Sequence, residues 1–157
     1  MIANKIRLRP FSPDDQAAAK ALIVAGLGER WGWIDPTLNP DLNDIATTYA
    51  DGLFLVGYWD DTLVATGAVT PETMPDGRDA LRVVRMSVRA DLRGQGIGRR
   101  VLDALLEGAR ARNCPLVVLE TTSTWIDAVR FYTRYGFTVV EERDGDTHMQ
   151  LEIGKAR

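Results

Sequence analysis

The sequence contains one cysteine, Cys114, and one histidine, His148. A single cysteine excludes an intramolecular disulfide and a thiolate metal cage, so we expect no metal. Cys114 stands beside Pro115 at a predicted helix-to-strand junction, where an inert, buried small side chain is the more common role than a nucleophile. A Cys–His nucleophilic pair would need these two residues to meet, and no pattern in the sequence indicates that they do.

Long apolar runs are also missing. The longest, from Ala17 to Gly28, is interrupted by Lys20 and is shorter than the roughly 20 residues that span a bilayer. The first ten residues hold no apolar segment typical of a signal peptide. With 157 residues, 45% of them hydrophobic and 26% charged, the composition predicts a single globular domain over residues 1–157. We expect a cytoplasmic protein with no membrane partner.

Charge is unevenly distributed along the chain. Between Asp35 and Asp61 there are six Asp and no Lys or Arg, whereas residues 78–100 hold seven Arg against two Asp. The basic run is narrow and the sequence pI is about 5.2, so we expect no nucleic-acid partner. A compact anionic ligand would suit the basic segment better, although both segments could be solvated surface.

Hydrophobic periodicity and capping signals predict eleven main elements in the order β-α-α-β-β-β-α-β-α-β-β. This order indicates an α/β fold with a mixed sheet. The expected strands include 53–59, 63–69, 81–88, 116–119, 137–142 and 149–153, and the expected helices begin near Ser12, Asn39, Ile97 and Thr124. Alternation changes phase in the strand 81–88, which predicts a β-bulge near Val83–Val84.

The most informative segment is Arg93-Gly94-Gln95-Gly96-Ile97-Gly98, between a predicted strand and a predicted helix. A glycine-rich turn that opens a helix presents free backbone N–H groups and the positive end of the helix dipole, which together suit a phosphate. Arg99 and Arg100 follow where a Walker loop needs Lys and Ser or Thr. A dinucleotide site stays a minor alternative because the third glycine comes one residue early, although Glu120 stands near the position of its acidic residue.

Three motifs together resemble the GNAT superfamily of N-acetyltransferases. The family's Gln/Arg-x-x-Gly-x-Gly/Ala signature is matched by Arg93, Gly96 and Gly98, and its bulged strand by Met86-Ser87-Val88. Its helix motif is matched by Ala128, Phe131, Tyr132, Gly136 and Phe137. The resemblance implies a mixed, mostly antiparallel central sheet, flanked by helices and splayed at the acyl-CoA site.

The resemblance also implies that acetyl-CoA is the co-substrate. Its pyrophosphate would be held by the N–H groups of Arg93, Gly94, Gln95, Gly96, Ile97, Gly98 and Arg99. Its pantetheine arm would pair with the backbone of Met86, Ser87 and Val88. Trp125 stands where the family often has an Asn, so one side-chain contact to the coenzyme is not matched.

For the chemistry, the resemblance makes Tyr132 the general acid that protonates the departing sulfur. From its helical spacing alone, the favoured role of Tyr132 is that of a core aromatic. Arg82 stands where family members often carry a glutamate base, and Glu120, twelve residues before Tyr132, is the better candidate. Glu72 and a chain of water molecules stay open as alternatives.

The leading hypothesis is therefore an N-acetyltransferase acting on a primary amine of a small molecule or a peptide. A non-catalytic acyl-CoA sensor of the same fold is the alternative. Trp33 and Asp35 are tentative acceptor-binding residues, because aromatic faces and carboxylates attract a cationic substrate. The other interpretation of this segment places the Trp pair in the core and the Asp residues at helix caps. Formation of a homodimer through the C-terminal hairpin also stays open.

Overall fold

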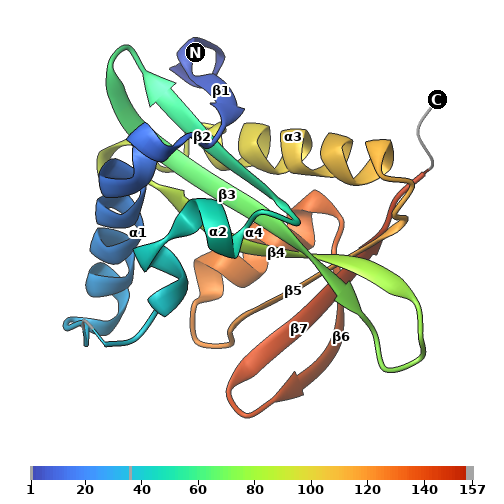
Figure 1. Ribbon diagram of the computed structural model, residues 1–157. Helices are drawn as coiled ribbons and strands as arrows, with labels where there is room; N and C mark the ends of the chain where they lie inside the picture. The colour runs from blue at the N-terminus through green and yellow to red at the C-terminus, as the bar shows by residue number, and fades with distance from the viewer. Residues whose placement is uncertain (1, 36, 155–157) are drawn as a thin grey trace. The chain divides into compact units, whose positions relative to one another are not determined.

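The computed structural model describes residues 2–35 and 37–154 and contains the predicted order of strands and helices (Figure 1). The strands are β1 (Arg7–Pro10), β2 (Leu53–Trp59), β3 (Thr62–Thr73), β4 (Asp79–Val88), β5 (Leu116–Thr122), β6 (Thr138–Arg143) and β7 (Asp146–Glu152). The helices are α1 (Gln16–Trp31), α2 (Ile45–Thr48), α3 (Ile97–Ala111) and α4 (Ile126–Tyr135). Short 3₁₀ turns are η1 (Ile2–Lys5), η2 (Pro13–Asp15), η3 (Pro40–Asn43) and η4 (Ala90–Leu92). No helix within the described residues has the length and hydropathy to cross a membrane.

The seven strands form one sheet in the order β1-β2-β3-β4-β5-β7-β6. The β1–β2, β2–β3, β5–β7 and β6–β7 pairs are antiparallel. β4 and β5 run parallel and pair through Leu81 with Val117 and Arg82 with Val118. The expected mixed, mostly antiparallel sheet flanked by helices is therefore confirmed.

Two predicted helix boundaries are wrong. α1 does not stop at Gly26 and Gly28 but continues to Trp31 and ends at Gly32, whose φ is 74°. Gly26 serves close packing instead, because a Cβ there would lie 3.2 Å from the Ser87 Oγ. α4 begins at Ile126, and its N-cap residue is Trp125, one position after the predicted cap at Thr124.

The helix predicted from Asn39 and the loop predicted at 71–77 also differ. Asn39 adopts a left-handed φ of 62°, and the chain forms the turn η3 before α2, where the Asp44 side chain accepts a hydrogen bond from the Thr47 N–H at 3.2 Å. β3 continues through Thr73, beyond the predicted end at Val69. There the Glu72 side chain binds Arg82 of β4 through two hydrogen bonds of 3.1 and 2.7 Å, a contact that stabilises the extended strand.

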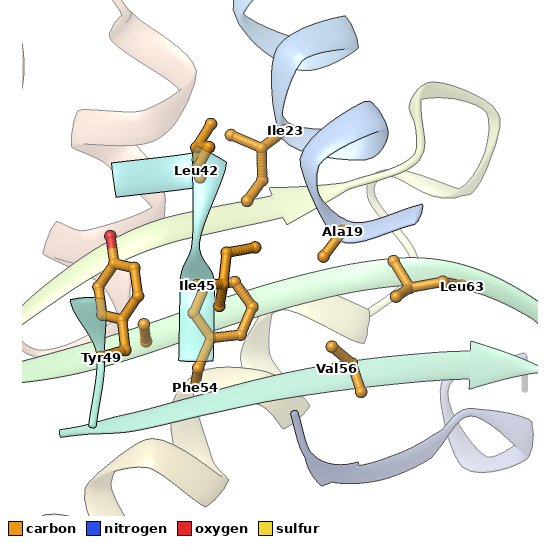
Figure 2. Packing of buried hydrophobic residues seen from close by; sticks show 9 residues of the cluster. Ala19, Ile23, Leu42, Ile45, Tyr49, Phe54, Val56 and Leu63 are labelled. Carbon is orange, nitrogen blue, oxygen red and sulfur yellow. The ribbon is translucent and has the colours of Figure 1, made fainter. Parts of the chain in front are cut away.

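The chain forms two compact units, residues 2–70 with 84–105, and residues 71–83 with 106–154. In the first unit, α1, η3 and α2 bury apolar side chains against one face of β2 and β3 (Figure 2). This cluster contains Ala19, Ile23, Leu42, Ile45, Tyr49, Phe54, Val56, Leu63 and Ala68. On the other face, Gly67 allows α3 to approach β3, because a Cβ at Gly67 would lie 2.6 Å from Val101.

In the second unit, β5 buries side chains on both of its faces, whereas β7 buries them mainly on one. Leu119 pairs with Met149 and Thr121 with Thr147, and all four side chains are buried. α4 packs on this face, because a Cβ at Gly136, which follows the helix, would lie 3.7 Å from Leu151. On the other face, Leu116 and Val118 of β5 are also buried, whereas Glu120 and His148 are partly exposed. Cys114 is half-buried rather than buried, with its Sγ 3.6 Å from the Leu116 carbonyl oxygen.

Asp15 anchors the start of α1 to the sheet of the first unit. Its buried carboxylate accepts hydrogen bonds of 2.7 and 2.8 Å from Arg9, 2.5 Å from the Tyr58 hydroxyl and 2.9 Å from the Ser12 N–H. Burial opposes ionisation of this carboxyl, but the hydrogen bonds outweigh it and lower the pKa of Asp15 to about 2. The Asp15 part of the capping box predicted at Ser12 is confirmed.

We expect Asp15→Asn to lower the free energy of unfolding at pH 7 by about 2 kcal/mol. Because the folded-state pKa of Asp15 lies below the ordinary aspartate pKa of 3.8, this stabilisation is present above pH 3.8 and is lost as pH falls through about 2. Urea unfolding between pH 7 and pH 2 measures both effects. Asp14→Asn, an exposed neighbour with the same charge change, is the control, and equal losses in the two variants would contradict the assignment.

Candidate functional site

The glycine loop is an exposed turn held between two buried residues. Leu92 before it and Ile97 after it are 5% and 1% exposed. Gly94 and Gly96 have φ of 76° and 87°, a region that favours glycine. The backbone hydrogen bond at the start of α3 runs from the Arg100 N–H to the Gly96 carbonyl at 3.2 Å, so the Ile97 and Gly98 N–H groups precede the hydrogen-bonded part of the helix. Open N–H groups at the positive end of a helix dipole fit a diphosphate.

The arginines around this loop offer less positive charge to an anionic ligand than the sequence predicted. Arg93 donates from Nε to the Val88 carbonyl at 2.9 Å and from Nη1 to Glu29 of α1 at 2.6 Å. Arg100 donates to the carbonyls of Ala3 and Ile6. Further pairs with carboxylates involve Arg78, Arg82, Arg85 and Arg89. The positive charge of the segment 78–100 is therefore largely balanced within the protein, and the loop backbone is the better-suited anion site.

β4 departs from regular strand geometry directly before Met86, Ser87 and Val88. Arg85 has a φ of 56°, so the irregularity lies at Arg85, just after the predicted position at Val83–Val84. A left-handed residue other than glycine costs on the order of 1–3 kcal/mol and persists where its surroundings enforce it. Here the Thr66 hydroxyl donates to the Arg85 carbonyl at 2.8 Å, which fixes the backbone of the strand from one side.

The Arg85 side chain fixes the same point from the other side. Its guanidinium binds Asp41 through hydrogen bonds of 2.9 and 2.6 Å, and the Tyr49 hydroxyl donates to Asp41 at 2.6 Å. Burial opposes ionisation of Asp41, but the bonds from Arg85 and Tyr49 outweigh it and lower its pKa. Sequence reasoning missed this network because its residues come from three separate segments.

Tyr132 lies on α4 in the second unit and is 8% exposed. Its ring makes edge-on contacts with Phe131 and Phe137, with centroids 5.0 and 5.7 Å apart. Burial raises the pKa of the Tyr132 hydroxyl, which keeps it protonated well above neutral pH. Tyr132 is therefore a core aromatic that also carries a protonated hydroxyl, so the two interpretations of the sequence are compatible.

Glu120 lies near the end of β5 with its side chain 50% exposed. It stands directly opposite His148 of β7, and its Oε2 is 3.6 Å from the His148 Nδ1. Glu72, the other carboxylate considered from the sequence, is bound by Arg82 and is thus less available as a base. Sequence reasoning missed the pairing of His148 with Glu120, since cross-strand register cannot be read from the sequence of an isolated strand.

Trp33 and Asp35 lie on the segment that follows α1. Trp33 is 72% exposed, so the interpretation that places the Trp pair in the core is wrong for this residue. Asp35 accepts hydrogen bonds from the Thr37 hydroxyl and the Thr37 N–H at 2.7 and 2.8 Å, and these bonds lower its pKa. Asp35 is thus ionised at neutral pH, while Asp41 and Asp44 are engaged by Arg85 and by α2.

A profile of the acetyltransferase (GNAT) family matches residues 21–137, about three quarters of the chain. The chain belongs to the GNAT acetyltransferase family. N-acetyltransferase 8F1 of Rattus norvegicus is 32% identical to this GNAT protein over 120 residues, which cover 74% of this chain and 54% of the relative. The chain spans about half the length of the curated relatives it matches.

Solved structures agree with this assignment. A GNAT-family acetyltransferase from Staphylococcus aureus superposes with a TM-score of 0.83 at 18% identity, covering 95% of this chain and 99% of that one. YncA, a putative acetyltransferase from Salmonella typhimurium described with its cofactor acetyl-CoA, gives a TM-score of 0.76 at 21% identity, covering 97% and 96%. At these identities the likeness shows the GNAT fold. Among residues 2–35 and 37–154, no group of His, Cys, Asp and Glu is arranged to hold a metal ion.

Proposed function

We propose that this GNAT protein transfers the acetyl group of acetyl-CoA directly to a primary amine of a small molecule or a peptide. The observation that carries the proposal is the exposed glycine loop at the start of α3, with Gly94 and Gly96 at positive φ. The N–H groups from Gly94 to Gly98 bind the pyrophosphate, whereas the Arg93 N–H, which was also expected to bind it from the sequence, donates to the Ala90 carbonyl at 3.5 Å. The backbone of Met86, Ser87 and Val88, which follows the left-handed residue of β4, binds the pantetheine arm.

The reaction has to move two protons off the nitrogen and one onto the sulfur. The ammonium group of the acceptor loses its first proton with the help of Glu120, and the neutral nitrogen attacks the thioester carbonyl. When the carbon–sulfur bond breaks, the Tyr132 hydroxyl protonates the leaving thiolate, and the second proton that the nitrogen loses on becoming an amide returns to Tyr132 through solvent. Glu120 and α4, which carries Tyr132, lie on opposite faces of β5. Because the nitrogen and the sulfur are bonded to the same carbon during the transfer, both side chains have to reach that carbon, one from each side of the strand.

Release of free CoA from acetyl-CoA, measured with and without a panel of amines, tests the proposal. An enzyme releases CoA only when an amine is present, and mass spectrometry then detects the acetylated amine. A non-catalytic sensor would be stabilised by acetyl-CoA and would return it intact. Binding of acetyl-CoA without any transfer across polyamines, aminoglycosides, amino acids and peptides would favour the sensor.

We further propose that the acceptor is cationic beyond its reacting amine. The exposed Trp33 ring can bind an ammonium group through its face, and the ionised Asp35 adds attraction nearby. The other Asp residues of the segment support this less, because Asp41 and Asp44 already have partners in the protein.

We expect Asp35→Asn to raise the KM for a polyamine several-fold and to leave the KM for a neutral-bodied amine of similar size unchanged. The polyamine KM of the wild type should also rise with salt, because exposed charges are screened within about 10 Å at 0.1 M. Asp61→Asn, the same charge change in the exposed β2–β3 turn, is the control. Equal use of both amines, with no effect of salt, would leave the acidic segment as solvated surface.

A further inference from the structure

Glu120, His148 and Glu141 form a row across three neighbouring strands of the second unit. The β5–β7 register places Glu120 opposite His148, and the β6–β7 register places Glu141 opposite His148 on the other side. Residues directly opposite one another in antiparallel strands project from the same face of a sheet. The single histidine of the chain therefore stands between two carboxylates on one face.

Of these two carboxylates, Glu120 is the partner of His148. The Glu120 Oε2 is 3.6 Å from the His148 Nδ1, whereas the Glu141 Oε1 is 3.1 Å from Arg143. Glu141 is thus already balanced by an arginine. Along β7, the nearest residues on the face of His148 are Asp146 and Gln150. The His148 side chain is 20% exposed and the Glu120 side chain is 50% exposed, so the pair remains accessible to solvent.

A structural role explains this pair poorly. α4 covers the opposite face of β5 and β7, where Thr147 and Met149 are each 1% exposed. On its own face the row adjoins Val118 of β5, which is buried, so the partly exposed pair lies at the edge of a covered region. A partly exposed ion pair of this kind contributes little to stability. A titratable pair kept accessible near the end of β5 fits proton transfer better than packing.

We propose that His148 takes up the proton of the acceptor amine and that Glu120 acts through His148 as its positioning residue. This inference rests on the acetyl transfer proposed above and changes the part that Glu120 plays in it. A carboxylate facing Nδ1 holds the imidazole proton on that nitrogen and leaves the lone pair on Nε2. An imidazole ordinarily titrates closer to neutral pH than a carboxyl group, which makes it the better-matched base.

The proton balance is simple. The ammonium N–H bond of the acceptor breaks, and its proton passes to the His148 Nε2, directly or through one water molecule. The nitrogen keeps the electron pair and attacks the thioester carbonyl. As the carbon–sulfur bond breaks, Tyr132 protonates the thiolate, and the second proton that the nitrogen loses on becoming an amide replaces the one that Tyr132 gave. Glu120 balances the charge of the imidazolium, which then releases the proton to solvent. No oxidant, metal or further reactant is needed.

The test measures kcat and kcat/KM against pH for the wild type, His148→Gln, Glu120→Gln and the double variant, with an amine that the wild type acetylates. We expect His148→Gln to lower kcat about 100-fold and to remove the acidic limb of the profile. Glu120→Gln should be slower than the wild type, roughly 10-fold, and should keep an acidic limb. Because the two residues act as a unit, the double variant should be no slower than His148→Gln.

Glu142→Gln is the matched control, since Glu142 lies on β6 opposite Thr147 and thus projects from the other face. It should leave the kinetics unchanged. An unchanged thermal shift with acetyl-CoA in every variant shows that the fold and donor site are intact. Wild-type kcat in His148→Gln would overturn the proposal, whether or not Glu120→Gln is slow. A wild type that binds acetyl-CoA and acetylates no amine would instead overturn the proposed function.

Discussion

Tyr132→Phe should lower kcat by about 100-fold or more, while the dissociation constant for acetyl-CoA stays within a factor of two. The change removes one hydroxyl and keeps the ring, so the edge-on contacts with Phe131 and Phe137 are preserved. The lost interaction is made only as the thiolate leaves, and therefore the loss appears in kcat. Steady-state kinetics together with a binding titration of acetyl-CoA separate the two effects.

The pH dependence of kcat gives a second test of the role of Tyr132. A general acid works in its protonated form, and burial raises the pKa of Tyr132 above its ordinary value. We therefore expect no loss of kcat from deprotonation of Tyr132 between pH 7 and pH 9. Tyr135→Phe, on the same helix, is the matched control and should keep most of the activity. Wild-type kcat in Tyr132→Phe would assign protonation of the sulfur to water.

Local patterns were sufficient to predict the fold. Amphipathic periodicity defined α3, and the glycine loop, the Met86-Ser87-Val88 strand and the Tyr132 helix could each be recognised within a few residues of sequence. These features depend on neighbours along the chain. Boundaries that depend on distant contacts were wrong. At Gly26 the helix α1 continues, and a glycine stands there because Ser87 packs closely against it.

The candidate site was predictable only where it is local. Arg85 with Asp41, and Glu120 with His148, are pairs separated by dozens of residues and joined by strand register or by packing of η3. Charge counting could not foresee that most arginines of residues 78–100 have partners within the protein. It therefore overestimated the positive charge offered to a ligand. The backbone of the glycine loop, which carries no formal charge, is the stronger basis for the anion site that we propose.

Gly96→Glu should abolish the stabilisation of the fold by acetyl-CoA. A ligand that binds only the native state stabilises it by RT ln(1 + [L]/Kd), or about 2.7 kcal/mol at a concentration of 100 Kd. Gly96 has a φ of 87° and lies directly before the first residue of α3, where the open N–H groups meet. A glutamate there brings a Cβ and a negative charge to the proposed pyrophosphate site. Thermal unfolding with and without acetyl-CoA measures the difference.

The loss of stability caused by backbone strain at Gly96 has to be separated from the loss of acetyl-CoA binding. Gly145→Glu makes the same change at a φ of 83° in the β6–β7 turn, where nothing lies within 4 Å of an added Cβ. That variant should lose a similar amount of intrinsic stability and keep the full acetyl-CoA shift. Gly96→Ala, which adds bulk without charge, should retain part of the shift. If Gly96→Glu folds and still shows the full shift, the pyrophosphate binds elsewhere on the protein.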